Sequence, residues 1–305
     1  FTVKIRFLFI LTYVIISLAR AQEHQVYHVP IHGTIDMGLP HFIQRVVNEA
    51  EEHNAKAIII DIDTFGGRVD AATQIKDIIL DSEVTTIAFI NKRAISAGAL
   101  ISLSCDSIFM TPGASIGAAT AVDLKGNKAS EKVISYMREE MASTAEANNR
   151  SREIATSMVD EELSIPYFLN IKGDTLTVKD VQGFSEGKLI TLSTNLAVQL
   201  GISNKEIETY DDLLIYLNFA DAETIEVTET WSEVLVRFLT NPMVAPLFMS
   251  LGMLGLFMEI KSPGFGVPGI SGLLCLALFF GSHLLVGLAD MTEMLILFAG
   301  IMLIL

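Results

Sequence analysis

The sequence contains only two cysteines, Cys105 and Cys275, and its six histidines show no ligand spacing. Because Cys275 lies in a long apolar run and Cys105 does not, a structural disulfide between them is not expected. Without a Cys-x-x-Cys pair or a Cys/His cluster, the sequence gives no support for a zinc site. We therefore expect neither a metal ion nor an organic cofactor.

Basic residues are scarce as well. The chain has 21 lysines and arginines against 36 aspartates and glutamates, which gives a formal net charge of -15. A strongly acidic chain repels the phosphate backbone of DNA and RNA. Nucleic acid is therefore not an expected partner.

Half of the residues are hydrophobic, and the excess lies at the two ends of the chain. At the N-terminus, Lys4 and Arg6 form a basic head, residues 7–18 are almost continuously apolar, and Ala19-Arg20-Ala21 has the form of a cleavage site. We expect residues 1–21 to be a signal peptide or an N-terminal anchor, followed by an exported domain. The chain begins without methionine and stops inside an apolar run, so we expect a fragment.

Three apolar runs follow one another near the C-terminus, over residues 242–258, over 270–288 and from Met294 onward. Only short polar turns separate them, which is not typical of buried helices in a soluble core. We therefore expect a helical transmembrane region over 242–305. The acidic stretch 221–241 before it has the composition of a linker, and Trp231 suits either a membrane interface or a packing role.

The middle of the chain, residues 22–220, alternates between strand and helix patterns. Short β-branched runs are followed by amphipathic segments with apolar residues at i, i+3 and i+4. Runs that are apolar throughout are typical of strands buried on both faces, and strand–helix alternation predicts parallel pairing. The expected strands are 26–31, 57–62, 84–90 and 107–110, and the expected helices include 42–50, 69–79, 97–104 and 130–148.

Chemistry is expected where these strands end, because parallel sheets place their sites at the carboxyl edge. The run Asp63-Thr64-Phe65-Gly66-Gly67 follows one strand. Its two glycines leave backbone N–H groups unobstructed, as an oxyanion hole requires. An ordinary strand-to-helix turn would explain the same residues.

Ser96 follows the next strand and opens a helix among small neighbours, Ala94, Ala97, Gly98 and Ala99. Small neighbours let a substrate approach the hydroxyl, and a helix N-terminus offers free N–H groups to a developing oxyanion. Serine is also a common N-cap, so a purely structural role remains open. The loop 111–117 after a further strand is either a packing turn or part of a substrate groove.

Taken together, three motifs resemble a known family. A strand leading into D-T-x-G-G, then an S-A-G-A helix, then P-G-A-S-I-G is similar to the NfeD-like membrane-bound serine proteases of the ClpP class, which are related to signal peptide peptidase A. The resemblance covers about 28–201 and continues in the turn 262–269 between apolar spans. The sequence departs from the family at Phe65, where proline is usual.

The resemblance implies a ClpP/crotonase-like α/β domain with a parallel sheet, followed by transmembrane helices. It implies Ser96 as nucleophile and Lys132, four residues before Tyr136, as the base of a Ser–Lys dyad. By periodicity alone Lys132 is a surface residue, and Lys125 and Lys128 compete for the role. The N–H groups of Gly67 and Ala97 would form the oxyanion hole, and Phe65, Gly66 and Gly117 would line the substrate groove.

The function implied is a membrane-anchored serine endopeptidase that cleaves hydrophobic segments of membrane-associated proteins. The family further implies a stomatin-like partner and a homo-oligomer. We expect a location in the bacterial inner membrane, with the protease domain on the extracytoplasmic side because it follows an export signal or anchor. One alternative is a non-catalytic membrane scaffold that partners stomatin-like proteins. Another is a crotonase-type acyl-CoA enzyme, although such enzymes use a carboxylate and are normally cytoplasmic.

Overall fold

The structure is a computed structural model, which describes residues 25–123, 126–161, 167–170, 172–177, 188–261 and 266–304. The expected signal peptide or anchor, Lys125 and the first half of the turn at 262–269 lie outside these residues.

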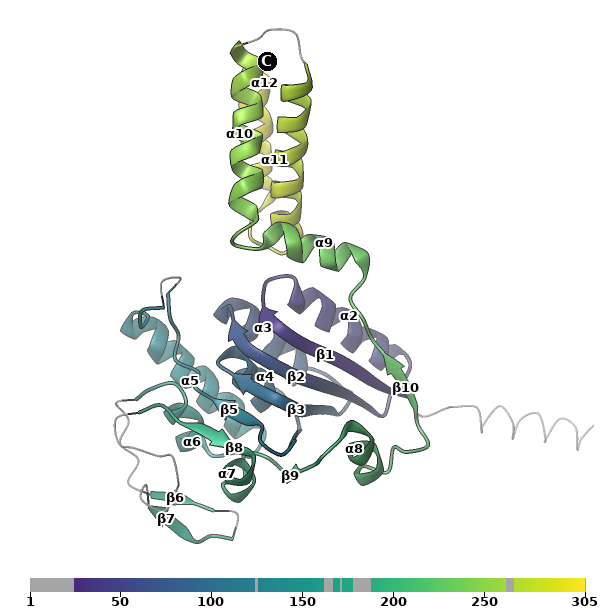
Figure 1. Cartoon of the computed structure of the whole chain (residues 1–305), viewed down its shortest axis with the longest axis vertical. Coiled ribbons are helices and arrows are strands. Elements are labelled where there is room, and N and C mark those ends of the chain that lie inside the picture. The colour runs from purple at the N-terminus through teal and green to yellow at the C-terminus, as the bar shows by residue number, and fades with distance from the viewer. Residues whose placement is uncertain are drawn as a thin grey trace, which may run out of the picture.

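A parallel sheet forms the centre of the α/β domain (Figure 1). Its strands lie in the order β10-β1-β2-β3-β4-β9, and every neighbouring pair along this path is parallel. The bounds are β1 Gln25–Ile35, β2 Ala57–Gly67, β3 Thr86–Ile95, β4 Ser107–Met110, β9 Lys205–Glu206 and β10 Glu223–Glu226. The short strand β5 (Ser115–Gly117) continues beside β3 and pairs antiparallel with β8 (Thr191–Ser193).

Helices cover both faces of this sheet. The larger hydrophobic core lies under α2 (Leu39–Glu52), α3 (Val69–Leu80), α4 (Ala97–Ser104), α5 (Glu131–Ala147) and α6 (Arg152–Ser157). A smaller apolar cluster on the opposite face is closed by α8 (Tyr210–Tyr216). Helix α7 (Thr194–Gln199) follows β8. The antiparallel pair β6 (Tyr167–Leu169) and β7 (Thr175–Thr177) lies between α6 and β8 in the sequence.

The α/β domain with a parallel sheet is thus confirmed. Strands β1, β2 and β3 are longer than predicted, and β4 has the predicted bounds. Strand β2 continues from the expected end at Ile62 through Gly67. The apolar run is shorter than the strand because Asp61 and Asp63 point to the face of the sheet that α8 covers only in part. Beyond the run, polar residues therefore alternate with buried ones within the same strand. The D-T-x-G-G motif therefore lies in a strand rather than in a turn.

The acidic stretch expected as a linker is also structured. Residues 223–226 form the edge strand β10, which pairs with the first half of β1, and α9 (Trp231–Thr240) follows it. Helix α9 begins at a capping box in which the Thr230 side chain and Glu233 satisfy each other's backbone N–H groups. The composition of this stretch suggests a linker because β10 forms a strand only by pairing with β1, which is distant in sequence.

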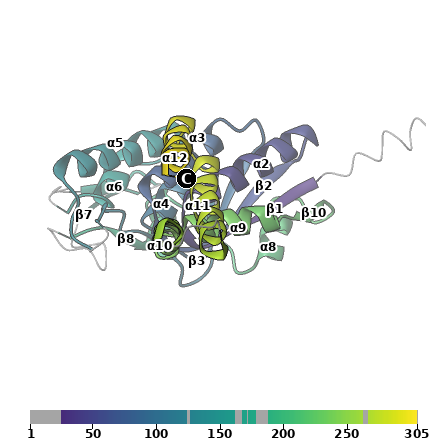
Figure 2. The ribbon, with the colours of Figure 1, turned by 90° about the horizontal axis from the view of Figure 1, so that it is seen from above.

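The C-terminal region consists of α10 (Ala245–Lys261), α11 (Val267–Leu285) and α12 (Met291–Ile304), which Figure 2 shows nearly end-on. Within the described residues, α11 is the one helix that alone is long and apolar enough to cross a bilayer. Helices α9 and α10 pass the same test only together, and they are bent by 75°. The predicted helical membrane region is therefore confirmed, with one candidate span rather than three.

Helices α10 and α11 pack closely through glycines. A Cβ atom on Gly255 would lie 2.6 Å from the Cα atom of Gly272, so the two backbones are nearly in contact. At the end of this hairpin the buried carboxylate of Glu259 accepts hydrogen bonds from the N–H groups of Gly266 and Gly269 at 2.9–3.0 Å. Glu259 thereby caps the start of α11 and fixes the turn between the two helices.

His28 of β1 contacts side chains of the edge strand β10, of β2 and of helix α8. Its Nδ1 atom lies 2.6 Å from the Glu226 carboxylate, its Nε2 atom lies 3.6 Å from Asp61, and its ring packs on Tyr210 at 4.3 Å between centroids. Burial disfavours the charged ring, but the carboxylates of Asp61 and Glu226 outweigh it and raise the pKa of His28 above 6.5. These contacts give His28 a structural role.

We expect the stabilisation by His28 to depend on pH. Because folding raises its pKa, its contribution is fully present well below pH 6.5 and is lost as the pH rises through the folded-state value. The variant His28→Gln should therefore lower the free energy of unfolding more on the acidic side of pH 6.5 than at alkaline pH. Chemical unfolding of both proteins across this range measures the difference. A difference that stays constant or grows with pH would contradict the assignment.

Candidate active site

Ser96 occupies a sharp turn between β3 and α4. Its backbone has φ 57° and ψ -120°, and its N–H donates to the carbonyl of Gly117 at 2.9 Å. The serine lies at the N-cap position, but its side chain accepts no capping hydrogen bond. The structural alternative for this residue is therefore not supported, and the half-buried hydroxyl remains available for chemistry.

The backbone of Ser96 is strained. A non-glycine residue in this region costs about 1–3 kcal/mol and persists only when its surroundings enforce it. In α/β-hydrolases a strained strand-to-helix turn of this kind presents the nucleophilic serine above the sheet edge. Here the enforcing contact is the strand pair of β3 and β5, in which Ile95 pairs with Gly117.

Gly66 lies against the Ser96 side chain. A Cβ atom at Gly66 would lie 2.6 Å from Ser96 Cβ and 3.0 Å from Ser96 Oγ, and the φ of Gly66 is +104°. Both the space and the backbone conformation therefore require glycine. This contact places the D-T-x-G-G motif and the serine motif, which the sequence separates by about thirty residues, in one site.

Thr64 joins the same two elements and was overlooked in the sequence. Its buried hydroxyl donates to the carbonyl of Gly33 at 2.5 Å and accepts from the N–H of Gly66 at 2.8 Å. Its methyl group fills the space above Gly98, where a Cβ atom would approach it to 2.5 Å. Thr64 thus positions Gly66 and the first turn of α4. The signal was available, because threonine is part of the motif that carried the resemblance.

The two expected oxyanion donors flank the serine. Gly67 pairs with Ile35 of β1, and the strands are so close that a Cβ atom on Gly67 would lie 2.0 Å from the Ile35 carbonyl oxygen. Ala97 is the first residue of α4, where N–H groups have no partner within the helix. Both residues line the same small cavity as Ser96.

This cavity has a volume of about 50 Å³, far below the roughly 300–1,000 Å³ of a typical ligand pocket. Besides Gly67, Ser96 and Ala97, it is lined by Val69, Ala119, Thr120, Ala121, Val122 and Met137. Met137 lies on α5, the helix that carries Lys132. The cavity can hold the reacting groups, whereas a longer substrate would have to lie across its rim.

Lys132 is not brought to this cavity. It lies in the first turn of α5 with an exposed side chain, and it is absent from the residues that line the cavity. Its position agrees with the periodicity, which predicted a surface residue. Of its two competitors, Lys128 pairs with Glu161 at 3.3 Å, and Lys125 lies outside the described residues.

The groove residues divide into two groups. Gly66 and Gly117 support the serine directly, the first by contact and the second by accepting its N–H. Phe65 does not line the cavity, is 73% exposed, and has the Arg93 guanidinium 4.4 Å from the centre of its ring. Asp63 holds that guanidinium at 3.1 Å. Phe65 therefore presents an exposed ring beside the site rather than a wall within it.

Buried Arg150 holds the far end of the serine helix. Its guanidinium donates to the carbonyls of Leu103, Cys105 and Asp106 at 2.9–3.1 Å, which are acceptors at or just past the end of α4.

Burial raises the pKa of the Cys105 thiol to about 12, so this cysteine stays protonated and does not compete with Ser96 as a nucleophile.

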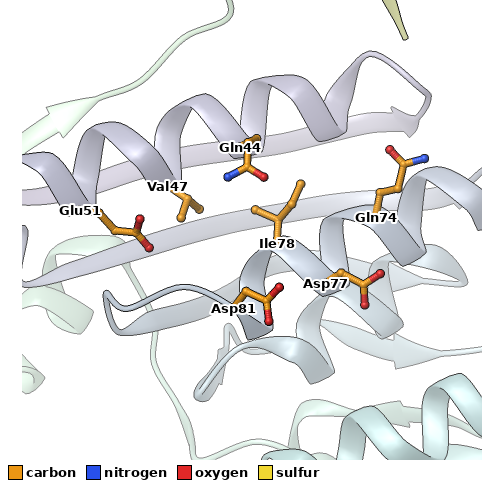
Figure 3. A pocket seen from close by; sticks show the side chains of 7 residues that line it. All are labelled: Gln44, Val47, Glu51, Gln74, Asp77, Ile78 and Asp81. Atoms are coloured by element: carbon orange, nitrogen blue, oxygen red, sulfur yellow. The ribbon is translucent and has the colours of Figure 1, made fainter. Parts of the chain in front are cut away.

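A larger hollow of about 480 Å³ lies elsewhere, between α2 and α3 (Figure 3). Three carboxylates, Glu51, Asp77 and Asp81, project around it, and no nucleophile lines it. Within the described part of the chain, no three His, Cys, Asp or Glu side chains are arranged to hold a metal ion. Among the described residues the hollow therefore offers neither a nucleophile nor a metal site, and Ser96 remains the candidate residue.

Two curated proteins resemble most of the chain. The membrane protein NfeD1b of Bacillus subtilis is 38% identical over 287 residues, which is 94% of this chain and 62% of that protein. The membrane-bound protease PH1510 of Pyrococcus horikoshii is 28% identical over 263 residues, 83% of this chain and 57% of that protein. The chain thus spans about three fifths of the length of these relatives.

Among solved structures, a lysine-to-alanine variant of the 1510-N membrane-bound stomatin-specific protease, in complex with a substrate peptide, superposes with a TM-score of 0.57. It is 25% identical, and the match covers 72% of this chain and 99% of that one. The ClpP-like fold predicted from the motifs is confirmed.

Two family descriptions match adjoining parts of the chain. The NfeD1b N-terminal domain matches residues 25–227, and the NfeD integral membrane domain matches residues 243–305. The chain therefore belongs to the NfeD family of membrane proteins, as the three motifs and the apolar C-terminal runs indicated.

Proposed function

We propose that this protein is a membrane-anchored serine endopeptidase with Ser96 as its nucleophile. The observation that carries the proposal is the strained turn at Ser96, whose hydroxyl makes no capping bond and lies against Gly66. Residues held in a strained backbone conformation cluster at active sites, where the surrounding structure enforces the strain. Its position at the carboxyl edge of a parallel sheet supports the same reading.

In the proposed reaction, the Ser96 oxygen attacks the carbonyl carbon of a peptide bond while its proton passes to the Lys132 amine. The oxyanion accepts hydrogen bonds from the N–H groups of Gly67 and Ala97, each of which contributes about 3 kcal/mol in comparable sites. The C–N bond then breaks, and the departing amine takes the proton from the lysine. Water hydrolyses the resulting ester and restores the serine hydroxyl.

Lys132 serves as the base only if its amine reaches Ser96. We infer that the first turn of α5 moves over the site when a peptide binds, since catalytic hydrogen bonds often tighten only in the complex. Met137 of the same helix already lies in the cavity wall. Support for a lysine comes from the 1510-N protease, whose lysine-to-alanine variant is in complex with a substrate peptide.

The proposed substrates are hydrophobic segments of membrane-associated proteins, with stomatin-like proteins as the first candidates. The 1510-N protease is described as a membrane-bound stomatin-specific protease, and this chain combines an α/β domain of similar fold with an integral membrane domain. The exposed ring of Phe65 next to Gly66 offers an apolar contact to such a segment. We further propose a homo-oligomer with the α/β domain on the extracytoplasmic side.

A non-catalytic scaffold is the second candidate, and one observation favours it. Lys132 is exposed and the cavity beside Ser96 measures about 50 Å³, so the described arrangement lacks an assembled base. In this reading the α/β domain would bind stomatin-like proteins without cleaving them.

Labelling with a fluorophosphonate probe, which reacts with activated serines, separates the two candidates. The full chain in detergent or lipid should be labelled, Ser96→Ala should not, and Lys132→Ala should be labelled about 100-fold more slowly because general-base assistance is lost. Lys128→Ala is the matched control, since its ion pair with Glu161 lies on the surface, and it should behave as the unmodified protein. Absence of labelling in the unmodified chain would favour the scaffold. Slower labelling of Lys128→Ala, with Lys132→Ala unaffected, would identify Lys128 rather than Lys132 as the general base.

A further inference from the structure

Helix α9 carries an exposed apolar stripe. Four large apolar residues follow the spacing i, i+3, i+4 and i+7, which places them on one side of a helix. Their exposed fractions are 80% for Trp231, 51% for Val234, 41% for Leu235 and 53% for Phe238. A stripe of this size is unusual on a surface that faces water alone.

The other side of α9 is bound to the α/β domain by two arginine–carboxylate pairs. Glu233 of α9 receives two hydrogen bonds from Arg45 of α2, at 2.9 and 3.0 Å. Arg237 of α9 donates to Asp36, just after β1, at 2.8 and 3.1 Å, and to the Thr34 carbonyl at 3.1 Å. Because 3.6 residues make a turn, Glu233 and Arg237 lie opposite the apolar stripe. The stripe therefore faces away from the domain.

The direction of α9 is set by the membrane helix that follows it. Helices α9 and α10 meet at 75°, and α10 lies in the integral membrane domain. Membrane helices run close to the bilayer normal, with an average tilt of about 20°. Helix α9 then runs close to the plane of the bilayer, and Figure 1 shows it lying crosswise between the α/β domain and α10–α12.

We propose that α9 is an interfacial helix whose apolar stripe, Trp231, Val234, Leu235 and Phe238, is buried in lipid at the boundary between headgroups and acyl chains. Lipid is the occupant because the stripe is continuous with a membrane domain and runs along the membrane surface. Amphipathic helices of this kind bury their apolar face about 5–10 Å deep. A tryptophan at the start of the stripe fits that depth, since tryptophan favours the interface.

The same helix fixes the height of the serine site above the bilayer. Arg237 holds Asp36, and the preceding residue Ile35 pairs with Gly67 and accepts the N–H of Arg68 at 2.8 Å. These contacts connect α9, at the lipid surface, to the carboxyl edge of the sheet. The inference concerns the placement of the domain and holds whether or not Ser96 is catalytic.

Trp231 is the only tryptophan in the sequence, so its fluorescence reports on the stripe in the full chain. The protein is reconstituted at one copy per nanodisc in phosphatidylcholine, with bromine placed either near the glycerol end or near the methyl end of the acyl chains. We expect blue-shifted emission, weak quenching by aqueous acrylamide, and a larger loss of intensity with shallow bromine than with deep bromine.

The matched control moves the reporter to the α/β domain. In Trp231→Phe/Ile215→Trp the tryptophan replaces an exposed residue of α8, and we expect strong quenching by acrylamide and none by either bromolipid. Trp231 emission that is quenched by acrylamide but not by bromolipid would overturn the proposal. Protection from both quenchers would overturn it as well, because a protein surface, such as a second copy or a partner, would then cover the stripe.

Discussion

Replacing Gly66 with alanine is expected to slow the labelling of Ser96 by a fluorophosphonate about 100-fold, because displacing a reacting group by about 1 Å costs a factor of this order. The new Cβ atom would lie 2.6 Å from Ser96 Cβ and 3.0 Å from its Oγ, so the serine side chain must shift. The rate of labelling of the folded protein, measured against probe concentration, checks this.

A second variant, Gly113→Ala, controls for the backbone strain that Gly66→Ala introduces. Gly113 has φ +80°, and among the described residues no atom lies within 4 Å of its Cβ position. Gly113→Ala therefore carries a similar conformational cost, about 1–3 kcal/mol, without a contact to these residues. Labelling of Gly113→Ala should remain at the unmodified rate. If both variants lose labelling equally, strain rather than contact with the nucleophile is responsible. If neither loses it, Gly66 does not position Ser96.

Replacing Arg150 with methionine is expected to lower the free energy of unfolding of the α/β domain by about 2–5 kcal/mol, since each buried carbonyl left without a donor costs about 1–3 kcal/mol. The side chain is 7% exposed and serves three carbonyls. Asn148 still donates to the Leu103 carbonyl at 2.9 Å, so the carbonyls of Cys105 and Asp106 carry most of the loss. Denaturant unfolding of the full chain in detergent measures the change.

Arg152 provides the comparison for this prediction. It lies two residues away, and its partners Glu139 and Glu146 are on the surface, so Arg152→Met should change the stability little. Arg150→Lys should recover part of the loss, because a single amine reaches fewer carbonyls than a guanidinium. Equal effects of Arg150→Met and Arg152→Met would show that burial of the guanidinium is not the cause.

The sheet and its helices were predictable because their signals are local. The β-branched run of β2 and the i, i+3, i+4 pattern of α2 each lie within one segment of sequence. Strand β10 was not predictable, because its four residues carry two glutamates and form a strand only by pairing with β1. The short strands β5 and β8 have three residues each and escaped prediction for the same reason.

The site was predictable in part. The nucleophile and the small residues beside it followed from motif spacing, and the contact between Gly66 and Ser96 brings those motifs together. The strain at Ser96 was not readable, since a positive φ depends on the pairing of β3 with β5. Lys132 came from the resemblance against its own periodicity, and its exposed side chain agrees with the periodicity. Its catalytic role stays a prediction.

The pairing of β10 with β1 also bears on how the chain matures during synthesis. Gln25 and Glu223 are 198 residues apart, and β10 comes immediately before α9 and the membrane helices. The sheet therefore cannot close at this edge until nearly the whole α/β domain has left the ribosome. Completion of the domain and insertion of its anchor thus fall within the same short interval of translation, and a chain released before residue 223 would expose an unpaired strand edge to its neighbours.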